Sequence, residues 1–188
     1  MLFRSLFSVV LAGFLVLPLA AGPTPSSVSS QVRLDQLFDA LAGAGEDEWQ
    51  VIEDEIRTLW ADSHSPSMNL LLQRGRDALA AEETDAAIEH LTALVDHAPD
   101  FAEGWNARAT AYFQAGLYGP AMADIRRVLT LEPRHFAALA GLGLILEDMG
   151  KPDLALKAYH QVQQIHPNRP DVAEAIARVE KTLGIGDV

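Results

Sequence analysis

The chain has 188 residues, enough for one ordinary domain, and carries a formal net charge of −12 at pH 7. This acidic charge repels nucleic acid and anionic lipid, so we expect no nucleic-acid partner, and membrane contact only through an anchor segment. The sequence contains no cysteine, which excludes disulfide bridges, thiol nucleophiles and cysteine-ligated metal ions.

Residues 1–21 have the three-part pattern of a secretory signal peptide. Arg4 supplies the positive charge, an apolar run covers residues 6–17, and small residues lead to Ala21. A cut after Ala21 leaves Leu19 as the third residue back from the cut, where a smaller residue is preferred, so the alternative is an uncleaved anchor. We therefore expect an exported chain in the bacterial periplasm, or one anchored in the membrane and facing the periplasm.

Two segments separate this start from the rest of the chain. Residues 22–31 are rich in proline and serine, which predicts a disordered linker. Residues 32–66 contain two amphipathic stretches around a glycine-containing turn, which predicts a helical hairpin. It has the length of a degenerate repeat or cap, and we expect its Trp49 and Trp60 to be buried against the helix pair that follows.

A period of 34 residues then runs through the chain, which indicates a repeat architecture. Small residues recur where two helices must cross closely, and prolines recur where a helix pair must end. The columns with this period are Gly75, Ala109 and Gly143; Ala87, Ala121 and Ala155; Leu91, Ile125 and Tyr159; and Pro99, Pro133 and Pro167.

The second copy resembles the signature of the tetratricopeptide-repeat (TPR) family, through Trp105, Ala109, Tyr112, Gly116, Tyr118, Ala121, Ile125, Val128 and Pro133. The first copy departs from it, with Leu71 in place of tryptophan and Glu82 in place of the glycine between the helices. The resemblance implies an all-α solenoid with a concave face, built from antiparallel helix pairs at 68–101, 102–135 and 136–169. An apolar stripe over 170–183 predicts a capping helix, and 184–188 form a tail.

No pattern in the sequence indicates catalysis, a cofactor or a metal site. The six histidines do not share the three- or four-residue spacing that places two ligands on one helix face. Metalloprotease, serine-hydrolase and phosphate-binding motifs are missing from the sequence. We therefore expect a protein that is not an enzyme, with no cofactor and no bound metal.

In the TPR family, the first helix of each repeat lines the binding groove. The resemblance carries this role to Asn69, Leu72, Gln73, Arg76, Glu103, Asn106, Thr110, Phe113, Gln114, Ala140, Leu144 and Glu147, with Leu79, Ala137 and Asp148 beside them. One TPR subclass holds the C-terminal carboxylate of chaperones with a cluster of lysine, arginine and asparagine. At the matching places this chain has one base, Arg76, among Leu72, Thr110, Ala137 and Gly141, so that activity is not implied.

These features together predict a scaffold or adaptor of the cell envelope that binds a polypeptide segment of a protein partner in its concave groove. One alternative is a structural subunit of an envelope complex whose repeats serve self-association. A more remote alternative is an enzyme whose site has no recognisable motif.

Overall fold

The computed structural model describes residues 25–45 and 48–185, and this part of the chain contains helices and no strand. The predicted signal segment and the last residues of the predicted tail lie outside the described residues. The helices are α1 (Pro25–Gly43), α2 (Trp49–Trp60), α3 (Pro66–Ala80), α4 (Thr84–His97), α5 (Ala102–Gln114), α6 (Tyr118–Leu131), α7 (Phe136–Asp148), α8 (Pro152–Ile165) and α9 (Pro170–Leu183).

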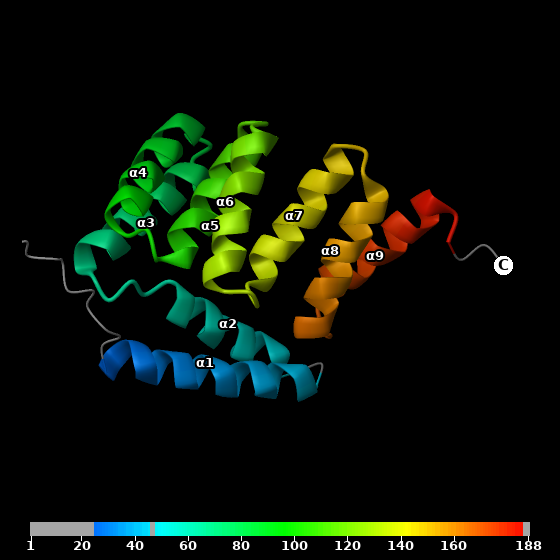
Figure 1. Ribbon diagram of the computed structural model, residues 1–188, viewed down its shortest axis with the longest axis horizontal. Helices are drawn as coiled ribbons and strands as arrows, with labels where there is room; N and C mark the ends of the chain where they lie inside the picture. Colours follow the sequence, from blue (N-terminus) through cyan, green and yellow to red (C-terminus); the bar gives the residue numbers. More distant parts are fainter. Residues whose placement is uncertain (1–24, 46–47, 186–188) are drawn as a thin grey trace, which may run out of the picture.

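Three antiparallel helix pairs, α3–α4, α5–α6 and α7–α8, stack side by side, and α9 packs on α8 (Figure 1). The predicted all-α solenoid of three repeats is therefore confirmed. Buried hydrophobic side chains form successive clusters along the stack, one joining α3, α4 and α5 and the next joining α5, α6 and α7. Each helix pair thus covers its apolar face with the pair beside it.

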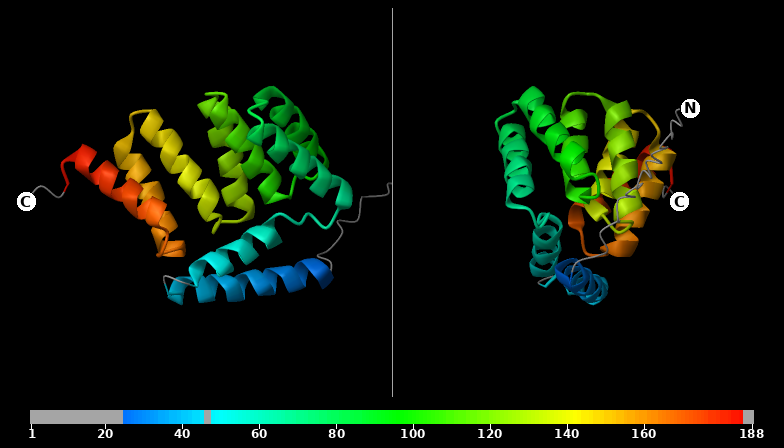
Figure 2. Two further views of the ribbon diagram at one scale, coloured as in Figure 1. Left: turned by 180° about the vertical axis from the view of Figure 1, so that it is seen from behind. Right: turned by 60° about the vertical axis from the view of Figure 1, so that its left-hand side comes forward.

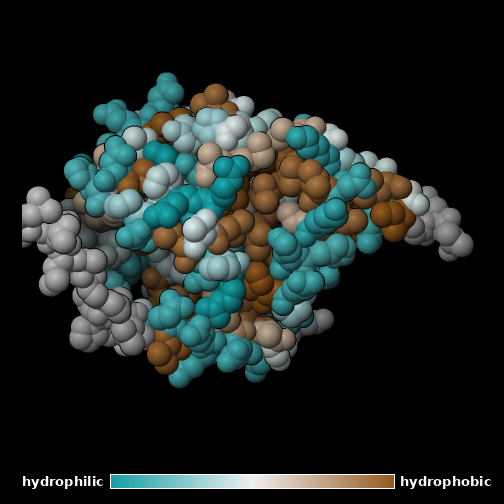
Figure 3. All heavy atoms as spheres, viewed as in Figure 1, coloured by the Kyte–Doolittle hydropathy of each residue, from teal (hydrophilic) through white to brown (hydrophobic). Residues whose placement is uncertain are grey.

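The helix α7 is the most apolar of these elements, with charged residues only at its C-terminal end. Figure 3 shows hydrophobic side chains gathered in the middle of one face, where α7 lies between α6 and α8. Leu129, Leu139 and Ile165 line a shallow hollow of about 450 Å³ among these helices. An apolar helix in this position can therefore bury side chains against both of its neighbours.

Small residues of the repeat allow the two helices of a pair to cross closely. A Cβ atom placed on Gly75 would overlap the side chain of Leu91, and one placed on Gly143 would overlap the ring of Tyr159. In the second repeat, Ala109 and Ile125 occupy the equivalent positions, and both are buried in one cluster. The helix spacing of each pair therefore depends on which two residues meet at this crossing.

The turn within each pair places one residue in the left-handed region of the backbone. Gly116 has φ +71° and Gly150 has φ +67°, and the matching residue of the first repeat, Glu82, has φ +61°. Glycine adopts this region freely, whereas a residue with a Cβ atom is strained there by about 1–2 kcal/mol. The first turn is therefore less favourable than the other two.

We expect Glu82→Gly to stabilise the protein by about 0.5–1 kcal/mol, because relief of strain outweighs the extra entropy of glycine in the unfolded chain. Urea unfolding followed by far-UV circular dichroism measures the change. The neighbouring Glu83 has φ −84°, so Glu83→Gly is the matched control and should destabilise. Stabilisation by both substitutions would contradict the role of the backbone angle.

The start of α1 corrects the prediction of a disordered linker over residues 22–31. The helix begins at Pro25, so residues 25–31 are helical. Proline suits the first turn of a helix, because the first backbone N–H groups have no partner within the helix. The helix is secured further along by Leu34, Leu37 and Phe38, which are buried against the repeats.

The predicted hairpin forms from α1 and α2, but the prediction that it packs on the first repeat is wrong. Trp60 stacks on His135, with ring centroids 4.0 Å apart, and lies 4.9 Å from the ring of Phe136. Trp49 lies edge-on to the ring of His166, at 5.1 Å. The hairpin therefore lies across one end of the stacked helices, as both views in Figure 2 show.

The reason for this position is a shared hydrophobic core. Leu34, Leu37, Phe38, Ile56 and Trp60 belong to one buried cluster with side chains of α7, α8 and α9. The first residue of α7, Phe136, is completely buried here, whereas the loop before α3 consists of the polar residues Asp62, Ser63, His64 and Ser65. Covering this aromatic ring removes more apolar surface from water than packing on that polar loop would.

Candidate functional site

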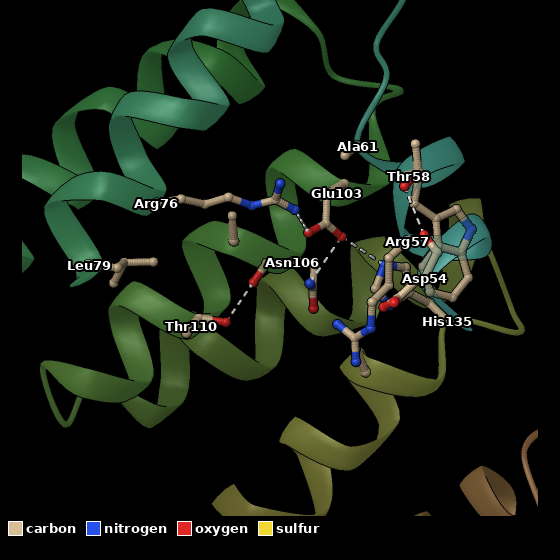
Figure 4. A pocket seen from close by; sticks show the side chains of 13 residues that line it. Asp54, Arg57, Thr58, Ala61, Arg76, Leu79, Glu103, Asn106, Thr110 and His135 are labelled. Atoms are coloured by element: carbon tan, nitrogen blue, oxygen red, sulfur yellow. Dashed lines mark hydrogen bonds and ion pairs between the residues drawn. The ribbon is translucent and has the colours of Figure 1, made fainter. Parts of the chain in front are cut away.

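Two adjoining cavities form a groove along α5 and α7, with volumes of about 730 Å³ and 380 Å³. Arg57, Asn106, Thr110 and Ala137 line both cavities, so the groove is continuous. Figure 4 shows side chains from α2, α3 and α5 converging on the larger cavity. The larger cavity is mainly polar, and the smaller one is lined mainly by apolar side chains from α5, α6 and α7.

Most of the side chains predicted to line a groove do line these cavities. The predicted residues in this position are Arg76, Glu103, Asn106, Thr110, Phe113, Gln114, Ala140 and Leu144, together with Leu79 and Ala137. They come from α3, α5 and α7, which are the first helices of the three repeats. The structure therefore brings these side chains to one surface.

Four predicted lining residues lie elsewhere. Leu72 is only 2% exposed and belongs to the core between α3, α4 and α5, so it offers no apolar surface to a ligand. Asn69 bonds Ser63 and Asp62 in the loop before α3. Gln73 donates to Asp77 on its own helix.

Glu147 is the fourth of these residues, and it holds the last repeat to the capping helix. It accepts a hydrogen bond from the Tyr159 hydroxyl at 2.6 Å and pairs with Arg178 of α9 at 2.8 Å. These bonds direct its carboxylate toward α8 and α9. Asp148 beside it accepts a hydrogen bond from the Tyr118 hydroxyl.

The hairpin supplies a wall of the groove that the sequence did not predict. The larger cavity is lined by three residues from one face of α2, namely Asp54 and, one turn further along, Arg57 and Thr58. Their spacing indicates a polar helix face, but nothing in the sequence shows that this face meets the repeats. Only the position of the hairpin across α7 brings them to the groove.

A fixed negative charge, Glu103, lies at the polar end of the groove. Its carboxylate accepts bonds from Arg76 at 2.5 Å, Asn106 at 3.1 Å and His135 at 3.1 Å. Burial raises the pKa of this carboxyl, but the hydrogen bonds from His135 and Arg76 and the charge of Arg76 outweigh burial, so its pKa lies below the usual range. Arg76 is therefore already paired within the protein.

The tautomer of His135 follows from its second contact. Its Nδ1 accepts a hydrogen bond from the backbone N–H of Ala138 in the first turn of α7. The proton of the neutral ring must therefore be on Nε2, where it points at the Glu103 carboxylate. His135 thus caps α7, carries Trp60 on its ring face and orients Glu103 in the groove.

A second buried carboxylate, Glu53, joins the hairpin to the loop between α8 and α9. Its Oε2 lies 2.8 Å from Nε2 of the fully buried His166, and its Oε1 accepts from Arg57 Nε at 2.6 Å. Burial raises the pKa of Glu53, but His166, Arg57 and Arg169 lower it more strongly, to about 2. The ionised carboxylate is therefore the form that the folded protein favours.

This pKa predicts how stability changes with pH. An ordinary glutamate pKa of 4.5 falls to about 2 on folding, so ionised Glu53 stabilises the folded state by about 3 kcal/mol above pH 4.5. That stability is lost as the pH falls from 4.5 toward 2, because both states then bind the proton. Urea unfolding between pH 6 and pH 2.5 should show a weaker pH dependence for Glu53→Gln than for the unsubstituted chain.

The matched control is Glu55→Gln, two residues along α2. Glu55 pairs with Arg33 on the surface of the hairpin, where both side chains are more than 40% exposed. Such a pair contributes little to stability. The pKa of Glu103 is also lowered on folding, so some pH dependence of stability should remain in Glu53→Gln. If the free energy of unfolding of Glu53→Gln depended on pH as strongly as that of the unsubstituted chain, the lowered pKa of Glu53 would be contradicted.

The apolar end of the groove is suited to a hydrophobic side chain. Leu144 is 44% exposed there, and Phe113, Ile125 and Ile145 lie around the same cavity. The Phe113 ring stacks on Tyr118 at a centroid distance of 6.0 Å, which limits its movement. Arg169 and Asp171 at the start of α9 pair with each other at the edge of this cavity.

Among the residues that the structure describes, no three histidine, aspartate or glutamate side chains are grouped so that they could hold a metal ion. None of the described helices is both long enough and apolar enough to cross a membrane. The described groove thus presents paired charges, amides and apolar side chains. These groups can bind a polypeptide through hydrogen bonds and apolar contacts.

Comparison with known proteins identifies the family. Residues 72–131 and 121–170 match the tetratricopeptide repeat family. A TPR repeat-containing protein of Rhizobium etli is 42% identical over 159 residues, which cover 84% of this chain and 78% of that protein.

Two solved TPR domains have similar folds. The first TPR domain of Spaghetti (RPAP3), bound to the HSP90 peptide SRMEEVD, has a TM-score of 0.61 at 23% identity, covering 65% of this chain and 96% of that one. The TPR2B domain of yeast Sti1, in complex with an Hsp70 peptide, has a TM-score of 0.59 at 14% identity, covering 63% and 99%. The family predicted from the sequence is confirmed, and the chain belongs to the tetratricopeptide-repeat family, whose domains are protein-interaction modules.

Proposed function

We propose that this protein is a non-catalytic scaffold or adaptor that binds an extended polypeptide segment along the groove. The observation that carries this proposal is the continuity of the two cavities, one polar and one apolar, along α5 and α7. An extended peptide places successive side chains on opposite sides, so an apolar residue can enter the smaller cavity while its backbone lies over Asn106. The HSP90 and Hsp70 peptides bound to domains of similar fold support a peptide as the ligand.

The mixed charge of the groove constrains the ligand. Arg76 is paired with Glu103, and Arg57 with Glu53. A ligand that relies on strong negative charge would have to compete with these internal pairs. The apolar cavity around Phe113 and Leu144 therefore supplies most of the affinity in this proposal, and the polar groups orient the backbone.

The substitution Thr110→Trp tests the groove. Thr110 is exposed and lines both cavities, so an indole there fills the groove without entering the core. Peptides selected from a random displayed library on the unsubstituted protein should bind Thr110→Trp about 30-fold or more weakly in fluorescence anisotropy, equivalent to the loss of one major contact.

Thr130→Trp is the matched control. Thr110 donates its hydroxyl to the carbonyl of Asn106, and Thr130 donates in the same way to Arg126 on α6. Thr130 is also exposed but lines neither cavity, so binding to Thr130→Trp should stay within about twofold. Equal binding of selected peptides to both variants would exclude the groove as their site.

We also propose that the protein acts in the cell envelope of a bacterium. The motivation is the signal pattern in residues 1–21, with its basic start and apolar run. A fusion of the full chain to alkaline phosphatase, which is active only after export, tests the proposal. Activity should disappear when residues 2–21 are deleted, and equal activity with and without them would exclude this segment as the export signal.

A further inference from the structure

The seam between the hairpin α1–α2 and the repeats is centred on the fully buried ring of Phe136. Trp60 approaches this ring from the hairpin at 4.9 Å, and His166 approaches it from the loop between α8 and α9 at 5.4 Å. The guanidinium carbons of Arg57 and Arg169 lie 5.6 Å and 5.7 Å from the ring centre. Aromatic and cationic groups are therefore crowded at one point.

This seam buries polar atoms without hydrogen-bond partners. In the part of the chain that the structure describes, the unpaired buried side-chain atoms are Trp60 Nε1, His166 Nδ1 and Arg169 Nη1. All three residues surround Phe136. Opening the seam would expose these atoms to water, so the closed arrangement is less stable than its buried apolar area implies.

Besides the shared hydrophobic cluster, a small set of polar contacts between distant parts of the chain holds the hairpin closed. Glu53 meets His166 at 2.8 Å, Asn168 donates to the carbonyl of Ala44 at 2.5 Å, and Arg134 pairs with Asp35 at 2.6 Å. The hydrophobic clusters of the first two repeats contain no buried residue of α1 or α2. Separation of the hairpin would therefore leave those clusters intact.

Residues 61–65 form the connection between α2 and α3. The backbone N–H groups of Ala61 and Asp62 still bond to α2, whereas the part that follows is held by α3. Asn69 of α3 accepts from the backbone N–H of Ser63 at 2.9 Å and donates to Asp62 at 3.0 Å. The end of α2 is thus the point about which the hairpin can turn.

We propose that the α1–α2 hairpin opens from the repeats as a unit while α3–α9 remain folded, and that it is a movable wall of the groove. Opening carries Asp54, Arg57 and Thr58 out of the larger cavity, which leaves that side of the groove open. If the hairpin then closed over a bound peptide, these side chains would contact the peptide. This consequence rests on the proposed peptide binding. The opening itself is tested without any ligand.

Hydrogen exchange of the full chain, followed by mass spectrometry, tests this opening. Amides of α1 and α2 should exchange at least about 10-fold faster than the most protected amides of α5 to α8, as a separately opening segment does. The substitution Leu91→Ala removes a fully buried side chain from the first cluster. It should accelerate exchange in α3 to α5 by about 30-fold or more while hairpin exchange changes less than about threefold, because hairpin opening breaks no contact of Leu91.

A parallel rise of hairpin exchange in Leu91→Ala would overturn the proposal, because it would show that the hairpin opens only when the repeats unfold. Val128→Ala in α6 is a milder second variant with the same expected pattern, in case Leu91→Ala does not fold. Glu53→Gln should accelerate hairpin exchange by about 10-fold or more, and Glu55→Gln by less than about threefold. Equal rates in these two variants would overturn the role of the Glu53–His166 contact.

Discussion

Replacing Trp60 with alanine should weaken the docking of the hairpin by about 3–5 kcal/mol, the usual cost of removing a large buried aromatic side chain. Trp60 is buried between His135 and Phe136, and it also contacts Phe38 within the hairpin. Urea unfolding followed by the fluorescence of Trp49, in a chain that carries Trp105→Phe, reports on the hairpin. In Trp60→Ala, the unfolding transition of the hairpin should move to a much lower urea concentration.

Val51→Ala is the control for this experiment, because Val51 lies on the same helix and is 72% exposed. It should change stability by less than about 0.5 kcal/mol. Far-UV circular dichroism of the Trp60 variant should still show a folded helical protein, since the clusters of the first two repeats do not include this side chain. An unchanged hairpin transition in Trp60→Ala would contradict the packing on α7.

Gly143→Ala should destabilise the protein by about 2–3 kcal/mol, although alanine favours a helix more than glycine does. The new Cβ atom would overlap the ring of Tyr159. This ring is 2% exposed, and its hydroxyl is bonded to Glu147 at 2.6 Å. The ring therefore cannot move aside without losing a hydrogen bond and disturbing its neighbours.

The same helix offers a control for this prediction. A Cβ atom on Gly141 would have its nearest neighbour, Ile125 Cδ1, at 4.0 Å, which is an ordinary contact. Gly141→Ala should therefore stabilise the protein by about 0.5–1 kcal/mol through helix propensity alone. Thermal unfolding of both variants would show opposite shifts, and destabilisation of similar size in both would contradict the overlap argument.

A double substitution tests the crossing itself. The second repeat has Ala109 and Ile125 where the third has Gly143 and Tyr159. Copying that pair, as Gly143→Ala with Tyr159→Ile, should be less destabilising than the sum of the single substitutions, because the smaller partner leaves room for the new methyl group. Additive losses would show that the two positions are not coupled.

The repeats could be predicted from the sequence because their signal is local and recurs. Each column of the 34-residue period describes a contact within a helix pair or with the next pair, so the pattern shows which faces meet. The groove positions on α5 and α7 follow from this register. The predicted groove positions of Leu72 and Glu147 are wrong, because alignment with the family shows only which face of a helix a residue occupies. The burial of Leu72 and the bonds of Glu147 to Tyr159 and Arg178 depend on the neighbouring helices.

The amino-acid pattern alone predicts the stacked helix pairs, the close crossings at Gly75 and Gly143, and Glu82 at the place of a turn glycine. The position of the hairpin, and the set of its side chains that enter the groove, follow from the folded arrangement of the helices. The contact of Glu53 with His166 joins residues 113 positions apart, and no repeated pattern marks either of them. Such a contact depends on the shape and hydrogen bonding of surfaces that exist only after the repeats have stacked.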